Sequence, residues 1–267
     1  MPETPGLRFQ SAALSDVGRK RSSNEDSFAL AAEHNLFVVA DGMGGHAAGE
    51  VASRLAVESI ERHISGTDPR KEPTYPASFR FPRSEEAGLP VPARRVLNAV
   101  RLANQEIVRS VRKNKSQRGM GTTVVIAYLH GARAFIGSVG DSRAYLVRGT
   151  SILQLTSDHT FVNEQVRAGT LSLQEARKHP ARNILTRAVG SQEEVDVDIV
   201  EQELKAGDAL LLCSDGLTTM VEDPQILTAV RDHPDDPEAA CGALIDLANA
   251  GGGDDNVTVL LIYARPA

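Results

Sequence analysis

Four stretches of this sequence bring an aspartate to one end of an apolar segment that is typical of a β-strand. Asp41 follows LFVVA, Asp141 follows AFIGSVG, Asp215 follows ALLLCS, and the pair Asp254 and Asp255 precedes NVTVLLI. Each one alone is typical of a turn or a helix N-cap. Together they predict a cluster, because strands that pack side by side would bring these carboxylates together. Carboxylates at that range repel one another and raise each other's pKa unless cations lie among them.

The residue types indicate which cations such a cluster would bind. Carboxylate oxygens beside a flexible glycine suit hard ions such as Mg²⁺ or Mn²⁺. Zinc is disfavoured, since His and Cys are not grouped at ligand spacing. Several carboxylates of this kind favour a two-metal site, which activates a water and binds a phosphoryl oxygen. That chemistry also needs a donor for the remaining phosphoryl oxygens, and a planar guanidinium suits it.

Short strands and amphipathic helices must position these acids. Apolar periodicity predicts helices over residues 48–64, 93–113, 223–231 and 237–249. Strands are predicted at 7–14, 27–33, 35–40, 122–129, 133–140, 143–149, 151–156, 195–202, 208–214 and 256–264. Hairpin-like spacings favour antiparallel pairing. We therefore expect an α+β fold, a four-layer α-β-β-α sandwich of two mainly antiparallel sheets flanked by helices.

Two segments fall outside this pattern. Residues 66–92 carry six prolines and mixed charge without a period, which predicts a long loop, with a partner-binding insertion as the alternative. Residues 158–190 are polar and predict short helices and loops. The length favours one large domain over two, so we expect residues 1–267 to form a single domain.

Composition limits the classes of function. A net charge of −6 and the absence of tryptophan argue against a nucleic-acid binder. Cys213 and Cys241 lie in apolar stretches, which predicts two buried reduced thiols. The sequence has no visible signal peptide and no apolar run of about 20 residues. We therefore expect a cytoplasmic protein without a nucleic-acid or membrane partner, and a monomer by default.

Eight segments resemble the metal-dependent type-2C protein phosphatases, the PPM family, in their bacterial form. They occur in the family's order and cover nearly the whole length of the chain. A lone DG or SDG would be a weak signal, whereas eight ordered segments are a strong one. They are RSSNEDSF (21–28), VVADGMGGHAAGEVAS (38–53), GMGTTVV (119–125), GSVGDSRAYLVR (137–148), LTSDHT (155–160), LTRAVG (185–190), CSDGL (213–217) and GGGDDNVTVLLI (251–262).

The resemblance implies a metal-binding role for five residues. In that family the aspartate of the DG pair bridges two metal ions, and the next glycine binds one through its carbonyl; here these are Asp41 and Gly42. The aspartates of SDG and DN complete the main site, which implies Asp215 and Asp255. The aspartate of GDSR takes part in a third, weaker metal site in bacterial members, which implies Asp141.

The RSSNED segment implies three further site residues. Arg21 matches the arginine that grips the substrate phosphate, since two residues separate it from Asn-Glu-Asp. Arg19 and Lys20 are then expected to be solvated surface charges. Glu25 and Asp26 correspond to acids that orient metal-bound waters.

One departure from the family concerns the general acid. Animal members carry a histidine directly after the DG pair, often assigned as the acid that protonates the leaving group, and this chain has Met43 there. The general acid is therefore unassigned, with a metal-bound water as the preferred candidate and a structural role expected for His46. His159 begins the segment that resembles the bacterial flap, residues 158–190, where substrate preference would be set.

The resemblance implies hydrolysis of phosphoserine and phosphothreonine in proteins, without a covalent intermediate. A water bridging two of two or three Mn²⁺ or Mg²⁺ ions would attack phosphorus while Arg21 neutralises the growing charge. The expected partners are phosphorylated proteins, including a bacterial Ser/Thr kinase that the enzyme opposes and the substrates of that kinase. Two alternatives stay open: a phosphatase acting on a small phosphorylated molecule, and an inactive scaffold that binds phosphoproteins.

Overall fold

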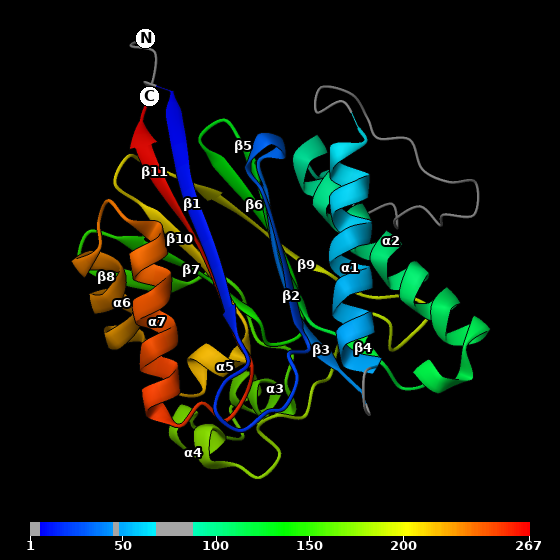
Figure 1. Ribbon diagram of the computed structural model, residues 1–267. Coiled ribbons are helices and arrows are strands. Elements are labelled where there is room, and N and C mark those ends of the chain that lie inside the picture. Colours follow the sequence, from blue (N-terminus) through cyan, green and yellow to red (C-terminus); the bar gives the residue numbers. More distant parts are fainter. Residues whose placement is uncertain (1–5, 45–47, 68–87) are drawn as a thin grey trace.

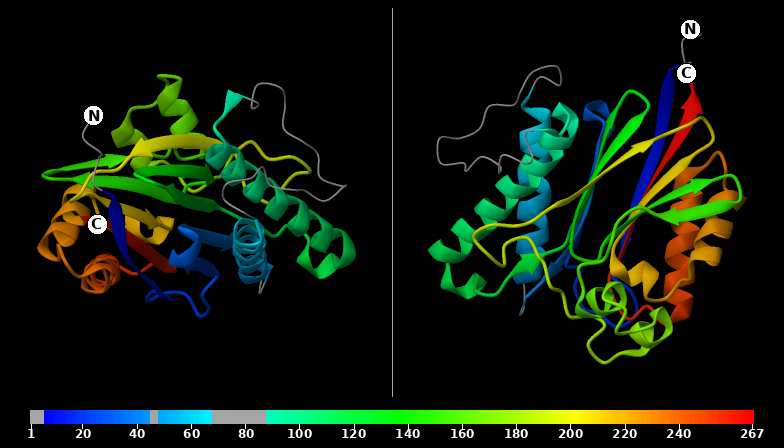
Figure 2. Two further views of the ribbon diagram at one scale, coloured as in Figure 1. Left: turned by 90° about the horizontal axis from the view of Figure 1, so that it is seen from above. Right: turned by 180° about the vertical axis from the view of Figure 1, so that it is seen from behind.

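Two antiparallel sheets pack face to face, with helices on both outer faces (Figures 1 and 2). The structure is a computed structural model that describes residues 6–44, 48–67 and 88–267. The expected α+β class and the four-layer α-β-β-α sandwich are confirmed. The greater part of the predicted loop at 66–92, and His46, lie outside the described residues.

The first sheet joins the two ends of the described chain. Its strand order is β1-β11-β10-β7-β8, and every neighbouring pair is antiparallel. The first and last strands pair over ten residues, from Leu7 with Pro266 to Asp16 with Val257. The strands are β1 (Leu7–Asp16), β7 (Arg143–Arg148), β8 (Ser151–Gln154), β10 (Ala209–Cys213) and β11 (Val257–Pro266).

The second sheet is built around a long buried strand, β3. Its order is β2-β3-β5-β6-β9, and the short strand β4 pairs with the end of β3. Strand β2 has one neighbour among the described strands of this sheet, so it forms the edge that lies beside β1 in Figure 1. The strands are β2 (Asp26–Ala31), β3 (Leu36–Met43), β4 (Gly121–Thr122), β5 (Val124–His130), β6 (Arg133–Val139) and β9 (Asp198–Glu203).

Helices cover the outer face of each sheet. The long helices α1 (Ala48–Ser65) and α2 (Val91–Lys113) pack on the second sheet, and α6 (Asp223–Asp232) and α7 (Pro237–Gly251) pack on the first. The short helices α3 (Phe161–Arg167) and α4 (Leu173–Lys178) lie in the flap, at one end of the sandwich (Figure 1). Three further helices in the described parts of the chain are α5 (Asp215–Thr218) and the 3₁₀ helices η1 (Ala32–His34) and η3 (Lys115–Gln117).

The apolar side chains form three layers, one between the sheets and one beneath each pair of long helices. Alternation along β3 shows how one strand serves two layers. Phe37 and Val39 face the other sheet, whereas Val38 and Ala40 face α1 and α2. Burial on both faces explains why the central strands are almost continuously apolar.

Several boundaries differ from the sequence prediction. The prediction that Asp41 ends its strand is wrong, because β3 continues through Met43, where it leaves β5 and pairs with β4. Helix α2 begins two residues early, since Pro92 lies in the first turn, where a missing N–H costs nothing. Strand β9 begins at Asp198 instead of residue 195. The four-residue helix α5 was not predicted.

Cys213 and Cys241 are both free and buried, as predicted. Among the helices that the structure describes, none combines the length and the apolar character that a membrane crossing requires.

Candidate active site

Five aspartates from both sheets converge at the flap end of the sandwich. Asp41 lies on β3, Asp26 begins β2, Asp141 follows β6, Asp215 begins α5, and Asp255 precedes β11. Their mutual influence shows that they are close together: the pKa of Asp41 is raised well above its usual range by burial and by the negative charge of the other four. The cluster predicted from the strand ends is therefore present, although Asp41 lies within its strand.

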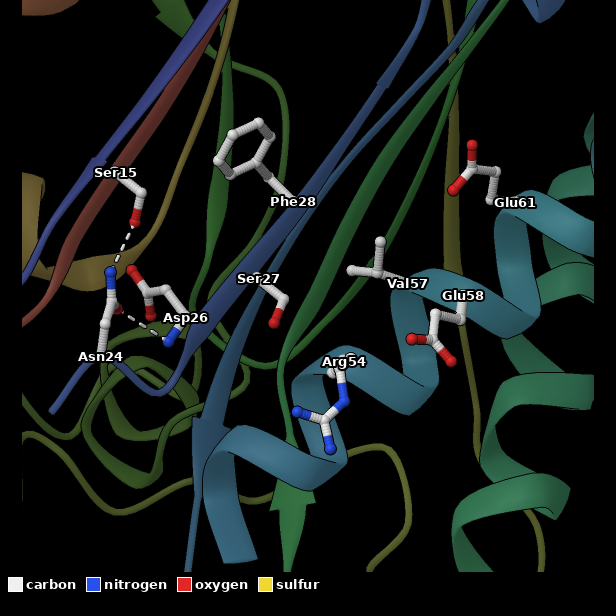
Figure 3. A pocket seen from close by; sticks show the side chains of 9 residues that line it. All are labelled: Ser15, Asn24, Asp26, Ser27, Phe28, Arg54, Val57, Glu58 and Glu61. Atoms are coloured by element: carbon white, nitrogen blue, oxygen red, sulfur yellow. Dashed lines mark hydrogen bonds between the residues drawn. The ribbon is translucent and has the colours of Figure 1, made fainter. Parts of the chain in front are cut away.

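Asp26 joins the two sheets. Its Oδ2 atom accepts hydrogen bonds from the hydroxyls of Ser214 (2.8 Å) and Thr258 (2.7 Å), which belong to the opposite sheet and its extension. Its backbone N–H donates to Asn24 Oδ1, whose amide in turn donates to Ser15 Oγ on β1 (Figure 3). Burial raises the pKa of Asp26 to about 7, even though the two hydroxyls act in the opposite direction. The Asp26 carboxylate is therefore buried between the two sheets and fixed there by these hydrogen bonds.

The electrostatics of the cluster favour a bound cation. Burial together with the charges of Asp215 and Asp158 raises the pKa of Asp141 to about 8. The pKa of Asp215 is also raised, by burial and then by the charge of Asp255. Positive charge among such groups would remove the repulsion and return each carboxylate to its ionised form.

Two buried oxygens in the cluster have no hydrogen-bond partner in the described part of the chain. They are Asp215 Oδ1 and Asp26 Oδ1. Within the described residues, no three His, Cys, Asp or Glu side chains already stand in a metal-binding arrangement. The donor set is nonetheless all oxygen, and an unpaired carboxylate oxygen on Asp215 is what a hard cation would satisfy. The residues present therefore fit Mg²⁺ or Mn²⁺.

Gly42 lies where the start of α1 meets the site. Its N–H donates to the carbonyl of Glu25 (3.0 Å), and a Cβ atom added at Gly42 would lie 2.1 Å from the carbonyl oxygen of Gly49. A Cβ atom on Gly49 would lie 2.1 Å from Glu25 Oε2. Only glycine at both positions lets helix α1, β3 and the Glu25 carboxylate approach this closely.

Arg21 reaches the cluster directly. Its Nη2 atom donates to Asp255 Oδ2 at 2.7 Å, while half of the arginine side chain stays exposed. Lys20 instead forms an exposed ion pair with Asp254 at 3.9 Å. The geometry thus distinguishes Arg21 from its basic neighbour, and Asp255 from the adjacent acid Asp254.

Asn256 positions the loop that carries Arg21, and it was not among the site residues predicted from the sequence. Its Oδ1 atom accepts from the N–H of Glu25 (2.8 Å), and its Nδ2 donates to the carbonyls of Val17 and Ser23 (2.9 Å each). Its own N–H donates to Asp255 Oδ1. The signal was available in the sequence, since Asn256 is the second residue of the DN pair.

The chain matches proteins of a known family over most of its length. The protein phosphatase 2C profile matches residues 18–237, most of the chain. The serine/threonine phosphatase stp of Listeria monocytogenes is 39% identical over 250 residues, which are 92% of each chain. The serine/threonine protein phosphatase PstP of Mycobacterium tuberculosis is 39% identical over 257 residues, 96% of this chain and 44% of that protein.

The chain belongs to the protein phosphatase 2C family. The crystal structure of M. tuberculosis PstP/Ppp superposes with a TM-score of 0.83 at 37% identity, covering 97% of this chain and 99% of that one. A structure of the PstP catalytic domain in complex with two manganese ions gives a TM-score of 0.81 at 35% identity, covering 98% and 100%. The predicted resemblance is confirmed, and this phosphatase is a hydrolase.

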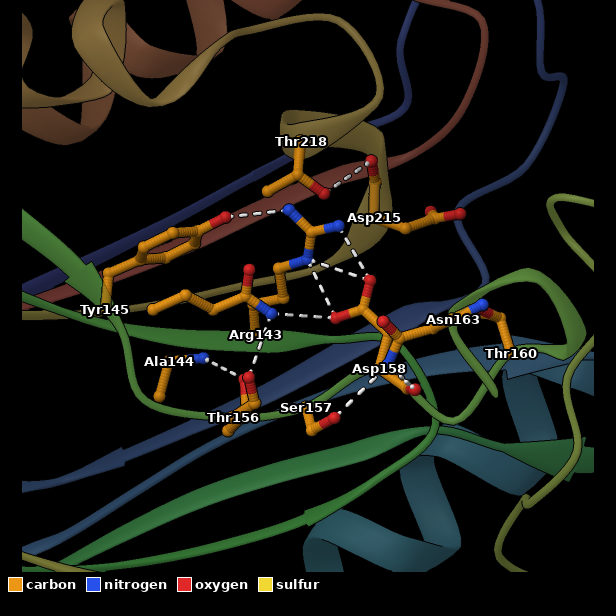
Figure 4. Close-up of polar contacts among 11 residues, drawn as sticks. Arg143, Ala144, Tyr145, Thr156, Ser157, Asp158, Thr160, Asn163, Asp215 and Thr218 are labelled. Carbon is orange, nitrogen blue, oxygen red and sulfur yellow. Dashed lines mark hydrogen bonds and ion pairs between the residues drawn. The ribbon is translucent and has the colours of Figure 1, made fainter. Parts of the chain in front are cut away.

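An ion pair between Arg143 and Asp158, whose side chains are largely buried, connects the flap to β7 (Figure 4). Arg143 donates from Nε (2.9 Å) and Nη2 (2.7 Å) to the two carboxylate oxygens of Asp158, and its Nη1 donates to the Tyr145 hydroxyl. Asn163 on α3 donates to the Asp158 carbonyl at 2.6 Å. The sequence showed GDSR and SDHT as motifs, but it did not show that they contact each other.

His159 has a structural role in this phosphatase. It is buried, its Nδ1 atom accepts the N–H of Gly140 (3.1 Å), and its Nε2 lies 3.1 Å from Asp198. Because Nδ1 accepts, the ring proton is on Nε2 and points to Asp198. Arg187 also binds that carboxylate, at 2.8 Å. The histidine therefore holds the segment before Asp141 and has no free nitrogen for a leaving group.

Proposed function

We propose that this chain hydrolyses phosphoserine and phosphothreonine in proteins with the help of two or three Mn²⁺ or Mg²⁺ ions. The convergence of four aspartates around Asp41, with Arg21 at their rim, carries this proposal. The named activity of relatives that align over nearly the whole of this chain supports the reaction class. The PstP structure with two manganese ions supports the choice of cation.

In this proposal Asp41, Asp215, Asp255 and the carbonyl of Gly42 hold the two main ions, and Asp141 holds a third. When bound, the ions supply an activated water and counter the charge of the phosphoryl group. Glu25 and Asp26 complete the acidic surroundings, Glu25 from beside Gly49 and Asp26 from between the sheets.

Arg21 binds the phosphoryl group. In the structure its guanidinium is paired with Asp255 and half exposed, so a phosphate that arrives at the rim can take over part of its hydrogen bonding. A guanidinium at this place neutralises charge that develops on the phosphoryl oxygens. Met43 has no proton to donate and both nitrogens of His159 are engaged, so a water is the preferred proton source for the leaving group.

The wider setting follows from the same reasoning. The protein acts in the cytoplasm as a monomer, residues 1–267 form one catalytic domain, and the flap at 158–190 contributes to substrate preference. Its substrates are those of a bacterial Ser/Thr kinase that it opposes.

The test is to measure phosphate release from a phosphothreonine peptide in the presence of Mn²⁺, Mg²⁺ or EDTA. The measurement is made on the unmodified chain, on Asp215→Asn and on the control Asp246→Asn. Asp246 is an exposed acid on α7 and is not one of the five clustered aspartates. We expect activity that requires metal, is lost in Asp215→Asn and is kept in Asp246→Asn. Hydrolysis of small phosphorylated molecules alone would favour the first alternative, and phosphopeptide binding without any hydrolysis would favour the scaffold.

A further inference from the structure

A groove runs along the open edge of the sandwich, from the acidic cluster up the side of α1 (Figure 3). Edge strand β2 forms its floor. Ser15 of β1 borders one side, and one face of α1 borders the other. The lining side chains are Ser15, Asn24, Asp26, Ser27, Phe28, Arg54, Val57, Glu58 and Glu61.

The groove is continuous with the candidate active site. Asp26 and Asn24 lie at its lower end, and Asp26 faces Asp41 directly across the β2–β3 pair. Asp26 is about nine-tenths buried, and its Oδ1 atom has no hydrogen-bond partner among the residues that the structure describes. If the phosphorylated residue of a polypeptide lies over the cluster, the residues next to it can therefore lie in the groove along β2.

The two sides of the groove differ in character because β2 alternates. On the side toward the other sheet, Phe28 follows Asp26 and is 39% exposed, the largest apolar side chain in the groove. On the side toward α1, Ser27 bonds to Ser53 on the helix. The exposed aromatic ring is therefore separated from the helix by the strand itself.

The α1 side carries unpaired negative charge. Glu58 and Glu61 are one helical turn apart and both line the groove. Neither forms a hydrogen bond or an ion pair with another residue in the parts of the chain that the structure describes. The basic residue nearby, Arg54, is already paired with Glu50 at 3.0 Å. This side of the groove is complementary to a cation.

Edge strand β2 also offers backbone groups. Among the described strands of its sheet β2 pairs only with β3, so alternate N–H and C=O groups on its outer side can bind an added strand. The side chains of such a strand would alternate between the Phe28 side and the glutamate side.

Building on the proposed function, we infer that the substrate segment next to the phosphorylated residue binds here as an extended strand along β2. A basic side chain faces Glu58 and Glu61, and an apolar side chain at an adjacent position faces Phe28. The groove thereby selects phosphoproteins that have a lysine or arginine and an apolar residue close to the phosphosite.

A charge swap tests this inference. Two series of phosphothreonine peptides carry a single lysine or a single glutamate at each position from three before to three after the phosphothreonine. The measurement is kcat/KM with the unmodified phosphatase, Glu58→Lys and the control Asp246→Lys, an equal charge change on exposed α7. We expect the unmodified protein to prefer lysine at one position. Glu58→Lys should reduce that lysine-to-glutamate ratio by about fivefold, mainly through KM, which is the size of effect expected for a partly exposed charge pair.

Phe28→Ser and a backbone probe test the rest of the arrangement. Phe28→Ser should raise KM for peptides with leucine beside the preferred lysine and leave the lysine-to-glutamate ratio as it was. N-methylation of the peptide amides that face β2 should raise KM. N-methylation of the alternate amides, which face away from β2, should have little effect on KM.

Equal ratios for Glu58→Lys, Asp246→Lys and the unmodified protein would overturn the inference while leaving the proposed function intact. A generic small substrate, p-nitrophenyl phosphate, separates the two. If metal-loaded protein hydrolyses neither this ester nor any peptide, it is the proposed function that fails.

Discussion

Asp26 and Asp41 face each other across the β2–β3 pair, two carboxylates on directly opposed residues of neighbouring strands. Like charges opposite each other destabilise a sheet. Here the cost is partly offset by Ser214 and Thr258, which donate to Asp26 from the other sheet. The arrangement is understandable as a cation site, because positive charge between the strands converts the repulsion into attraction.

The first prediction concerns the pH dependence of stability. The pKa of Asp26 is about 7 in the folded state and 3.8 as the reference for the unfolded chain. The folded state therefore binds this proton more tightly, and the free energy of unfolding should fall as pH rises from about 4 to about 7. In EDTA, chemical denaturation at a series of pH values should show this loss, and Asp26→Asn should reduce it.

The amide in this variant would keep an oxygen that can accept from the hydroxyls of Ser214 and Thr258. Asp26→Asn therefore removes the titrating charge and preserves these hydrogen bonds. Asp246→Asn serves as the control and should follow the unmodified protein. Equal slopes for all three proteins would mean that Asp26 is not a source of the pH dependence.

The second prediction concerns the contact between α1 and the site. Gly49→Ala would place a Cβ atom 2.1 Å from Glu25 Oε2 and 2.9 Å from the carbonyl carbon of Gly42. We expect the Kd for Mn²⁺, measured by calorimetry, to rise roughly tenfold, the size of effect seen when residues around metal ligands are changed.

Gly242→Ala is the matched control for this glycine. It lies in helix α7, where an added Cβ atom meets nothing within 4 Å, so the substitution should leave the metal affinity unchanged and raise stability by up to about 1 kcal/mol. If Gly49→Ala bound Mn²⁺ as tightly as Gly242→Ala, the close approach would have no bearing on the metal site.

The third prediction compares two ion pairs by burial. The Arg143 and Asp158 side chains are only 25% and 15% exposed, whereas those of Arg133 and Glu201 are 63% and 38% exposed. Asp158→Asn leaves a half-buried guanidinium without its charge partner and should lower the free energy of unfolding by roughly 3 kcal/mol. The equivalent change in the exposed pair, Glu201→Gln, should cost at most about 1 kcal/mol.

Proteolysis gives a second measurement of the same pair. Because Asp158 begins the flap, Asp158→Asn should speed tryptic cleavage within residues 158–190 more than elsewhere. Uniformly faster cleavage along the whole chain would show a loss of global stability and no particular role in the flap.

The fourth prediction distinguishes Arg21 from Lys20. Arg21→Ala should lower kcat/KM for a phosphothreonine peptide by about 100-fold, the effect expected for loss of one donor that stabilises the transition state. It should not weaken Mn²⁺ binding, because it removes the partner that competes for Asp255. Lys20→Ala, which removes only an exposed pair with Asp254, should change kcat/KM less than twofold. Equal losses in both variants would contradict the assignment of Arg21.

Local signals in the sequence determined much of this protein. Apolar periodicity predicted the long helices and most strands, because burial on one face depends on residue spacing alone. The ordered motifs predicted the family, and the aspartates at the strand ends predicted an acidic cluster. These features depend on residues that are close together in the sequence, so they could be predicted without knowledge of the fold.

Relationships between segments that are distant in sequence were decided only by the tertiary structure. Strand β3 runs past Asp41 because β4, some eighty residues later, pairs with its end. Asp26 is buried because residues 188 and 232 positions away donate to it. The groove exists because two edge strands and one helix meet at an open side of the sandwich. Such contacts depend on how the sheets pack against each other, and residue spacing along a single strand carries no information about that packing.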